Sequence, residues 1–170
     1  MAHVVTMAFG YALWAAALGC AVDVVSISMT EQFQVGMAGL VLPGTGFGVD
    51  LRRAISAREI DPADVDSLKI QKASLVMLSQ GGLTDDLAFL GDLLFEVTAD
   101  GLEPSYLARK DSFPPATRTA LLEVNRTLEL KTYLDAGGVV LSVSGRLDPP
   151  PPDRVELEIS LTFRLDANVI

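Results

Sequence analysis

Apolar and polar residues alternate one by one in the final stretch of the chain, RVELEISLTFRLDANVI, residues 154–170. The apolar set is Val155, Leu157, Ile159, Leu161, Phe163, Leu165, Ala167 and Val169. A strand collects such a set on one face, whereas a helix scatters it around its circumference. The stretch therefore predicts a half-buried β-strand. Its extended length of ~50 Å, at ~3.4 Å per residue, favours a bend or bulge that divides it.

Six upstream stretches also predict strands: residues 24–35, 67–78, 91–101, 104–113, 117–124 and 137–147. In SLKIQKASLVML, residues 67–78, the alternation shifts phase near Lys72 and Ala73, which indicates a β-bulge or a strand buried on both faces. Glycine and proline turn signals separate the stretches at short intervals. Seven such strands predict an all-β fold, an antiparallel β-sandwich that is immunoglobulin-like in the loose sense.

One or two short helices are expected to connect the strands. Asp61 is a candidate N-cap with Pro62 at the first helical position, and Thr127 is a second candidate cap with Gly137 as the stop. The proline run at residues 149–152 favours an extended connection over a tight hairpin before the last strand. The sequence does not determine the order of the strands.

The N-terminal segment carries no charge from Val4 to Val22, VVTMAFGYALWAAALGCAV. Its length and its run of small residues are typical of a secretory signal or a membrane helix. ALGC, residues 17–20, resembles a bacterial lipobox, in which a peptidase cuts before a cysteine that has received a lipid. The chain is similar in this respect to uncharacterised bacterial β-sandwich lipoproteins. The resemblance implies lipidation at Cys20 and a place in the bacterial cell envelope, at the outer membrane or the periplasmic face.

This interpretation divides the chain into residues 1–19, a signal peptide or membrane anchor, and residues 20–170, a single β-sandwich domain. Two alternatives stay open. The segment could be an ordinary cleaved signal or an uncleaved anchor, or it could be a buried helix or strand with Cys20 as a small apolar core residue. A single cysteine cannot form an intrachain disulfide, so the fold depends on packing.

Composition supports a packed core and excludes one class of partner. Of the 170 residues, 49% are apolar and 21% are charged, which is ample for one folded domain. The 13 basic and 22 acidic residues leave a net charge of −9, which repels phosphate backbones. We therefore expect no nucleic-acid partner.

The search for catalytic chemistry is largely negative, and we expect no enzyme activity, no catalytic residues and no cofactor. His3, the only histidine, precedes the apolar segment. LPGTGFGVD, residues 42–50, lacks the Gly-Lys-Ser/Thr of a phosphate-binding loop and is interpreted as a flexible loop. Asp61, Asp64 and Asp66 are weak calcium candidates, because their spacing matches no EF-hand and capping explains them equally well.

The expected function is therefore a non-catalytic binding or structural module. It would be held at the membrane by a lipid on Cys20 and would bind an unidentified protein partner. The alternative is a carrier of a lipid or another hydrophobic ligand. For that function, residues 68–78 and LAFLGDLLF, residues 87–95, would line a cavity between the sheets.

Overall fold

The described part of the protein is built from eight strands, two short α-helices and two 3₁₀ turns. A computed structural model describes residues 22–36, 45–48, 51–80, 82, 84–137 and 139–168. The strands are β1 (Val22–Val35), β2 (Thr45–Gly48), β3 (Val65–Met77), β4 (Leu90–Thr98), β5 (Ser105–Lys110), β6 (Thr119–Val124), β7 (Val140–Leu147) and β8 (Val155–Asn168). The helical elements are α1 (Leu51–Ser56), η1 (Pro62–Asp64), η2 (Leu87–Phe89) and α2 (Lys131–Asp135).

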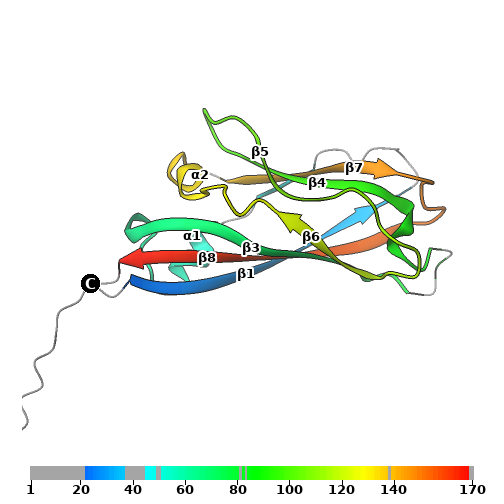
Figure 1. The fold of residues 1–170 in the computed structure, drawn as a ribbon, viewed down its shortest axis with the longest axis horizontal. Coiled ribbons are helices and arrows are strands. Elements are labelled where there is room, and N and C mark those ends of the chain that lie inside the picture. Colours follow the sequence, from blue (N-terminus) through cyan, green and yellow to red (C-terminus); the bar gives the residue numbers. More distant parts are fainter. Residues whose placement is uncertain are drawn as a thin grey trace, which may run out of the picture.

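The strands form one antiparallel sheet that folds over into two layers, in the order β1-β8-β3-β6-β5-β4-β7-β2. One layer holds β1, β8, β3 and β6, and the other holds β5, β4, β7 and β2, as Figure 1 shows. Only two residue pairs, Ala108↔Val124 and Arg109↔Glu123, join β5 to β6 where the sheet turns over. The predicted fold class, an antiparallel β-sandwich, is confirmed.

The long C-terminal strand is present as predicted, but it is not divided. β8 pairs with β1 over fourteen consecutive positions, from Val22↔Asn168 to Val35↔Val155, without a register shift. The predicted bulge is therefore absent from this strand, and no bend divides its ladder with β1. The two strands curve together along the length of the layer (Figure 1), because a shared twist accommodates a long strand without breaking its ladder.

The irregularity lies in the neighbouring strand β3, where the sequence places it. The register of β3 against β8 shifts between Ile70 and Lys72, and again between Val65 and Ser67. The first shift confirms the bulge predicted from the change of phase in SLKIQKASLVML. Residues 71 and 72 are both exposed, whereas burial alternates over residues 68–70 and 73–77. The bulge therefore turns two successive side chains toward solvent.

The core fills the space between the layers with side chains from both. Phe33 on β1 meets Phe95 on β4 edge to face, with ring centroids 6.4 Å apart and an interplanar angle of 75°. Phe163 on β8 is fully buried, and the other apolar residues of its alternating set within 155–167 are buried with it. Burial of each large apolar side chain contributes roughly 1.5–3 kcal/mol before the entropy of ordering is subtracted.

Two elements differ from the sequence expectation. Residues 45–48, interpreted as part of a flexible loop, form the edge strand β2, which pairs with β7 from Thr45↔Val143 to Gly48↔Val140. Pairing with a formed strand overrides the weak strand preference of glycine. Helix α1 was not predicted, because six residues are too few to show a helical repeat; burial of Leu51 and Ile55 fixes it.

Of the two caps predicted for the short helical elements, one is confirmed and the other is wrong. The Asp61 side chain accepts a hydrogen bond from Ala63 N at 2.9 Å and caps η1, as predicted. Thr127 does not cap α2, which begins at Lys131; its hydroxyl instead donates to Asn125 Oδ1 at 2.8 Å. Gly137 follows the helix with a φ of 99°, which confirms it as the stop.

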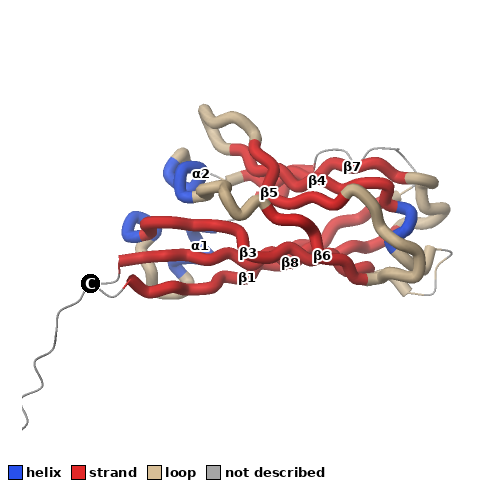
Figure 2. Tube along the Cα trace, in the orientation of Figure 1, coloured by secondary structure: helices blue, strands red, loops and turns tan. Residues whose placement is uncertain are grey.

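The connection through the proline run crosses from one layer to the other. β7 belongs to the β4 layer and β8 to the β1 layer, so the two strands do not pair with each other. The connection is therefore not a tight hairpin, as predicted; that it is extended stays a prediction. Both α-helices lie toward the end of the sandwich where β8 finishes, as Figure 2 shows.

Candidate functional site

The residues singled out in the sequence do not assemble into a site. Cys20 lies outside the described residues. Asp61 caps η1, Asp64 is exposed in that turn, and Asp66 is exposed at the start of β3. Across the described ranges, no three His, Cys, Asp or Glu side chains gather closely enough to hold a metal ion. The functional features therefore have to be sought on the surface of the sheets.

The bulge in β3 creates a polar feature on the outer face, by which we mean the solvent side of β1, β8, β3 and β6. An ordinary strand would present Lys69 and Gln71 outward and turn residue 72 inward. The extra residue brings Gln71 and Lys72 outward together. Bulges of this kind re-aim side chains beside functional sites.

Two cations lie directly opposite each other at this point. Lys69 on β3 is the register partner of Arg164 on β8. Like charges at opposed cross-strand positions destabilise a sheet, by about 0.2–1 kcal/mol on the scale of such pairs. Each cation has one acidic neighbour: Lys69 Nζ is 3.8 Å from Glu129 Oε2, and Arg164 Nε is 3.1 Å from Asp166 Oδ1.

A third cation, Arg126, comes from the turn that follows β6. Asn125 holds this turn, because its main-chain N donates to Leu107 O at 2.9 Å and its side-chain Nδ2 donates to Tyr106 O at 3.2 Å. Arg126 N donates to Val124 O at 3.1 Å. No ion pair involving the Arg126 or Lys72 side chain is seen within the described part of the chain.

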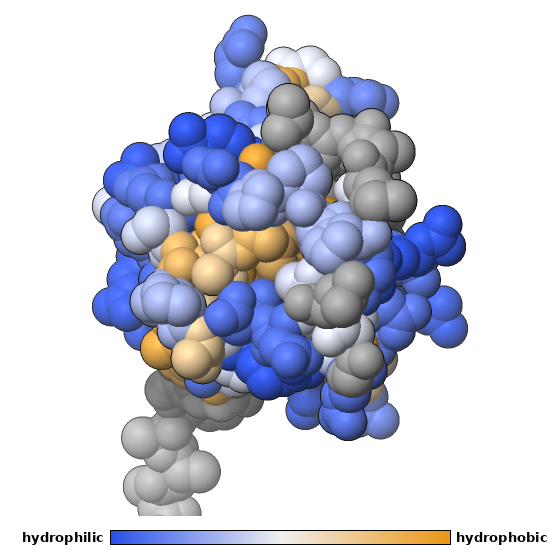
Figure 3. Space-filling view, turned by 90° about the vertical axis from the view of Figure 1, so that its right-hand side faces the viewer, coloured by the Kyte–Doolittle hydropathy of each residue, from blue (hydrophilic) through white to orange (hydrophobic). Residues whose placement is uncertain are grey.

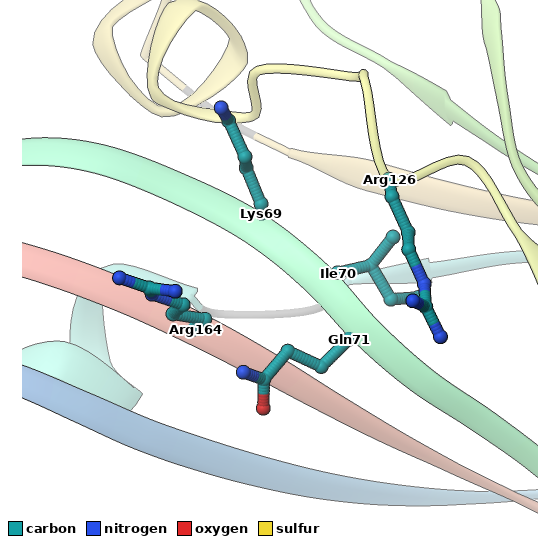
Figure 4. Close-up of a pocket in the computed structure, with 5 residues that line it drawn as sticks. All are labelled: Lys69, Ile70, Gln71, Arg126 and Arg164. Atoms are coloured by element: carbon teal, nitrogen blue, oxygen red, sulfur yellow. The ribbon is translucent and has the colours of Figure 1, made fainter.

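These groups surround a hollow in the outer face, which we call the basic depression. It has a volume of about 420 Å³ and is lined by Lys69, Ile70, Gln71, Arg126 and Arg164. Figure 4 shows its three cationic side chains pointing in different directions around the rim rather than toward one point. This arrangement suits an extended ligand with several negative groups better than one small enclosed anion.

A second hollow of about 370 Å³ continues from the first along β6. The two share Gln71 and Arg126, and the second adds Lys72 and the Leu121 side chain, which is 62% exposed. Its one acid, Glu123, is occupied by Arg109, whose Nε lies 3.4 Å from Glu123 Oε2. The hydrogen bond and charge of Glu123 raise the pKa of Arg109 above its ordinary value. An apolar surface and free cations thus lie side by side.

The chemistry available here is recognition of negative charge. The side chains that line the basic depression carry no thiol, hydroxyl or imidazole that could act as a nucleophile or general base. Arginine and lysine bind carboxylates through charge-assisted hydrogen bonds, which are stronger than those between neutral groups.

The two segments proposed to line a ligand cavity belong to the packed core. In residues 68–78, Leu68, Ile70, Ala73, Leu75 and Met77 are buried. In residues 87–95, Leu87, Phe89, Leu90, Leu93 and Phe95 are buried. Hydrophobic atoms are nevertheless visible at the end of the sandwich in Figure 3, ringed by hydrophilic residues. That end is the one at which β8 begins.

Sequence reasoning missed Lys69, Arg126 and Arg164 as a group. The phase shift located the bulge, and so the outward position of Lys72 could have been anticipated. The opposition of Lys69 and Arg164 depends on the register between β3 and β8, which are far apart in the sequence. No local pattern encodes that register.

Comparison with known proteins adds little to this geometry. The sequence matches no protein-family model and no curated protein. Among solved structures, the decameric BFDV capsid protein is similar over 88% of this chain and 100% of that chain, with 14% sequence identity and a TM-score of 0.42. No helix in the described residues is long and apolar enough to cross a membrane.

Proposed function

We propose that this protein is a non-catalytic binding module whose basic depression receives a carboxylate-rich segment of a partner protein. The observation that carries the proposal is the group of three cations around one hollow, in a chain whose net charge is −9. Two of these cations oppose each other across strands at a cost in stability. A site that costs stability and concentrates the minority charge is explained by binding.

The test is binding of a fluorescent oligoglutamate peptide, measured by anisotropy at low and at near-physiological salt. Wild-type protein is expected to bind, and affinity should fall as salt rises, because exposed charges are screened. Lys69→Glu/Arg126→Glu should weaken binding by about tenfold or more, which corresponds to ~1.4 kcal/mol. Arg58→Glu/Arg154→Glu is the matched control, since both arginines are exposed and outside the depression and the net charge changes by the same amount. Equal binding by both variants would refute the proposal.

The place of action is also a proposal, supported by the lipobox-like ALGC alone. A lipid on Cys20 would hold the module in the bacterial cell envelope. β1 begins at Val22, so a lipid on Cys20 would attach two residues before the first strand of the domain. The intact mass of protein purified from bacterial membranes tests this: residues 20–170 plus a diacyl or triacyl group supports anchoring, and an unmodified mass that includes residues 1–19 contradicts it.

Carriage of a hydrophobic ligand is the second candidate, favoured by the hydrophobic surface at one end of the sandwich (Figure 3). The Phe33–Phe95 contact between the layers makes it the weaker one, because a ligand between the sheets would have to separate these rings. Titration with a fluorescent fatty acid tests it. Saturable binding would favour the carrier if it also changed the near-UV circular dichroism, because that signal reports the packing of the aromatic rings in the core.

A further inference from the structure

The outer face is electrically divided along the length of β8. Arg164, with Lys69 opposite it and Asp166 as its ion-pair partner, lies toward one end, whereas Glu156 and Glu158 lie toward the other. Between them Ser160 and Thr162 contribute only hydroxyl groups. The face therefore has a basic end, a neutral middle and an acidic end.

The neutral middle is a row of hydroxyls that crosses three strands at one level. Ser160 on β8 has Thr30 as its register partner on β1 and Ser74 as its register partner on β3. The Thr30 and Ser160 hydroxyl oxygens lie 3.4 Å apart, and those of Ser28 and Thr162 lie 3.3 Å apart. These short side chains leave the row through Ser160 low and free of charge.

The acidic end is hydrogen-bonded but not neutralised. Glu156 Oε1 accepts from Gln34 Nε2 at 3.0 Å, and Glu158 Oε2 accepts from Gln32 Nε2 at 3.0 Å. The glutamines position the carboxylates without cancelling their charge. No ion pair to either glutamate is seen in the part of the chain that the structure describes.

One pair of opposite charges on β8, Glu156 and Arg164, is arranged symmetrically about Ser160. Arg164 lies four residues to one side of Ser160 and Glu156 lies four residues to the other, and both side chains are on the outer face. At ~3.4 Å per residue, each charge lies ~14 Å from the hydroxyl row. A two-fold axis that runs along the row, across the strands, would superpose the basic end of one copy on the acidic end of another.

We propose that the outer face is the interface between two copies of this chain, related by that two-fold axis. This inference rests on the proposed function, since the carboxylate-rich segment bound at the basic depression is then β8 of the second copy. Glu156 of each copy faces Arg164 of the other, with Lys69 beside it. Lys72, which is level with Thr162, lies beside Glu158 of the second copy. Isologous contacts of this kind are the commonest in soluble oligomers.

Charge selects this arrangement over the other two-fold pairing of the same faces. An axis along the strands would place Arg164 over Arg164 and Glu156 over Glu156. Repulsion between these like charges disfavours that arrangement. The area is also sufficient. Strands of fourteen residues at ~3.4 Å rise, three of them ~4.8 Å apart, cover ~700 Å² per copy or ~1,400 Å² in total, within the ~1,200–2,000 Å² of stable interfaces.

The test is sedimentation equilibrium of the full chain and of charge-reversed variants. Wild-type protein should dimerise with an affinity that falls as salt rises. Arg164→Glu and Glu156→Arg should each weaken dimerisation by about tenfold or more, and Arg164→Glu/Glu156→Arg should restore it. Arg58→Glu controls for the change in net charge. Circular dichroism of each variant shows whether it folds.

A crosslinking measurement checks the position of the axis without changing any charge. In a Cys20→Ala background, Ser160→Cys should form an intermolecular disulfide under mild oxidation, because residue 160 faces its own counterpart on the axis. Ser112→Cys, exposed in the loop after β5, should not. Monomeric wild-type protein throughout the micromolar range, or a double variant that stays as weak as the single ones, would overturn the inference.

Failure of this inference is distinguishable from failure of the proposed function. A monomeric protein that binds oligoglutamate, and loses binding in Lys69→Glu/Arg126→Glu, keeps the proposed function and shows that the partner is a different protein. A monomer that does not bind the peptide refutes both.

Discussion

Glu129 holds the turn that carries Arg126 against the unpaired edge of β3, and its replacement is the most informative single change. Its Oε1 accepts from Leu68 N at 2.7 Å and from Lys131 N at 3.2 Å, and its Oε2 accepts from the Ser67 hydroxyl at 2.8 Å. One carboxylate therefore bonds β3 and the first turn of α2 at once. Leu130 N donates to Leu68 O at 2.8 Å beside it.

We expect Glu129→Ala to lower the free energy of unfolding by about 2 kcal/mol. An unpaired main-chain amide costs roughly 1–3 kcal/mol, and the two other bonds contribute about 0.5–1.5 kcal/mol each. The Glu129 side chain is 36% exposed, so water replaces part of this loss. Glu129→Gln keeps an acceptor for Leu68 N and should cost about half as much.

Urea denaturation followed by circular dichroism measures the change in the free energy of unfolding. In thermal denaturation the same loss should lower the melting temperature by about 4–8 °C. Glu103→Ala is the control, because Glu103 is exposed and its side chain forms no ion pair or hydrogen bond with other described residues; it should change stability by less than about 0.5 kcal/mol. If Glu129→Ala changes stability no more than this control does, the carboxylate does not hold the turn.

Three further changes test the fold and the anchor. Phe163→Ala should cost about 3–5 kcal/mol in urea denaturation, because the ring is fully buried between the layers, and a loss below about 1 kcal/mol would contradict that packing. Gly145→Ala should cost about 1–3 kcal/mol, since a Cβ would collide with the main-chain carbonyl oxygen of Asp92 on β4; an unchanged denaturation midpoint would show that the strands lie further apart. Cys20→Ala should release the protein from the membrane fraction while its circular dichroism spectrum stays the same, and retention after a carbonate wash would rule out the lipid anchor.

The strands could be predicted because one face of each is buried. The alternation in residues 155–167 matches the alternating burial of β8, and the change of phase near Lys72 matches the bulge in β3. β2 was not predicted, because its pairing with β7, rather than its own residues, makes it a strand. α1 escaped because two buried residues in six form no recognisable period.

The candidate site could not be predicted, because it depends on register between distant strands. Lys69 and Arg164 are ordinary exposed cations until β3 and β8 are aligned. Arg126 joins them through the turn that Asn125 and Glu129 fix, which no local pattern specifies. Of the three aspartates that the sequence offered as calcium candidates, Asp61 instead caps a short turn by accepting from the main-chain amide two residues ahead.

The central claim is that the cations around the basic depression bind carboxylates. The most direct measurement is the affinity of oligoglutamate for wild-type protein and for Lys69→Glu/Arg126→Glu at matched ionic strength, with Arg58→Glu/Arg154→Glu as the control of equal charge change. The account predicts a loss of about tenfold or more in the double variant alone. Equal affinity in all three proteins, or no binding to any of them at low salt, would contradict it.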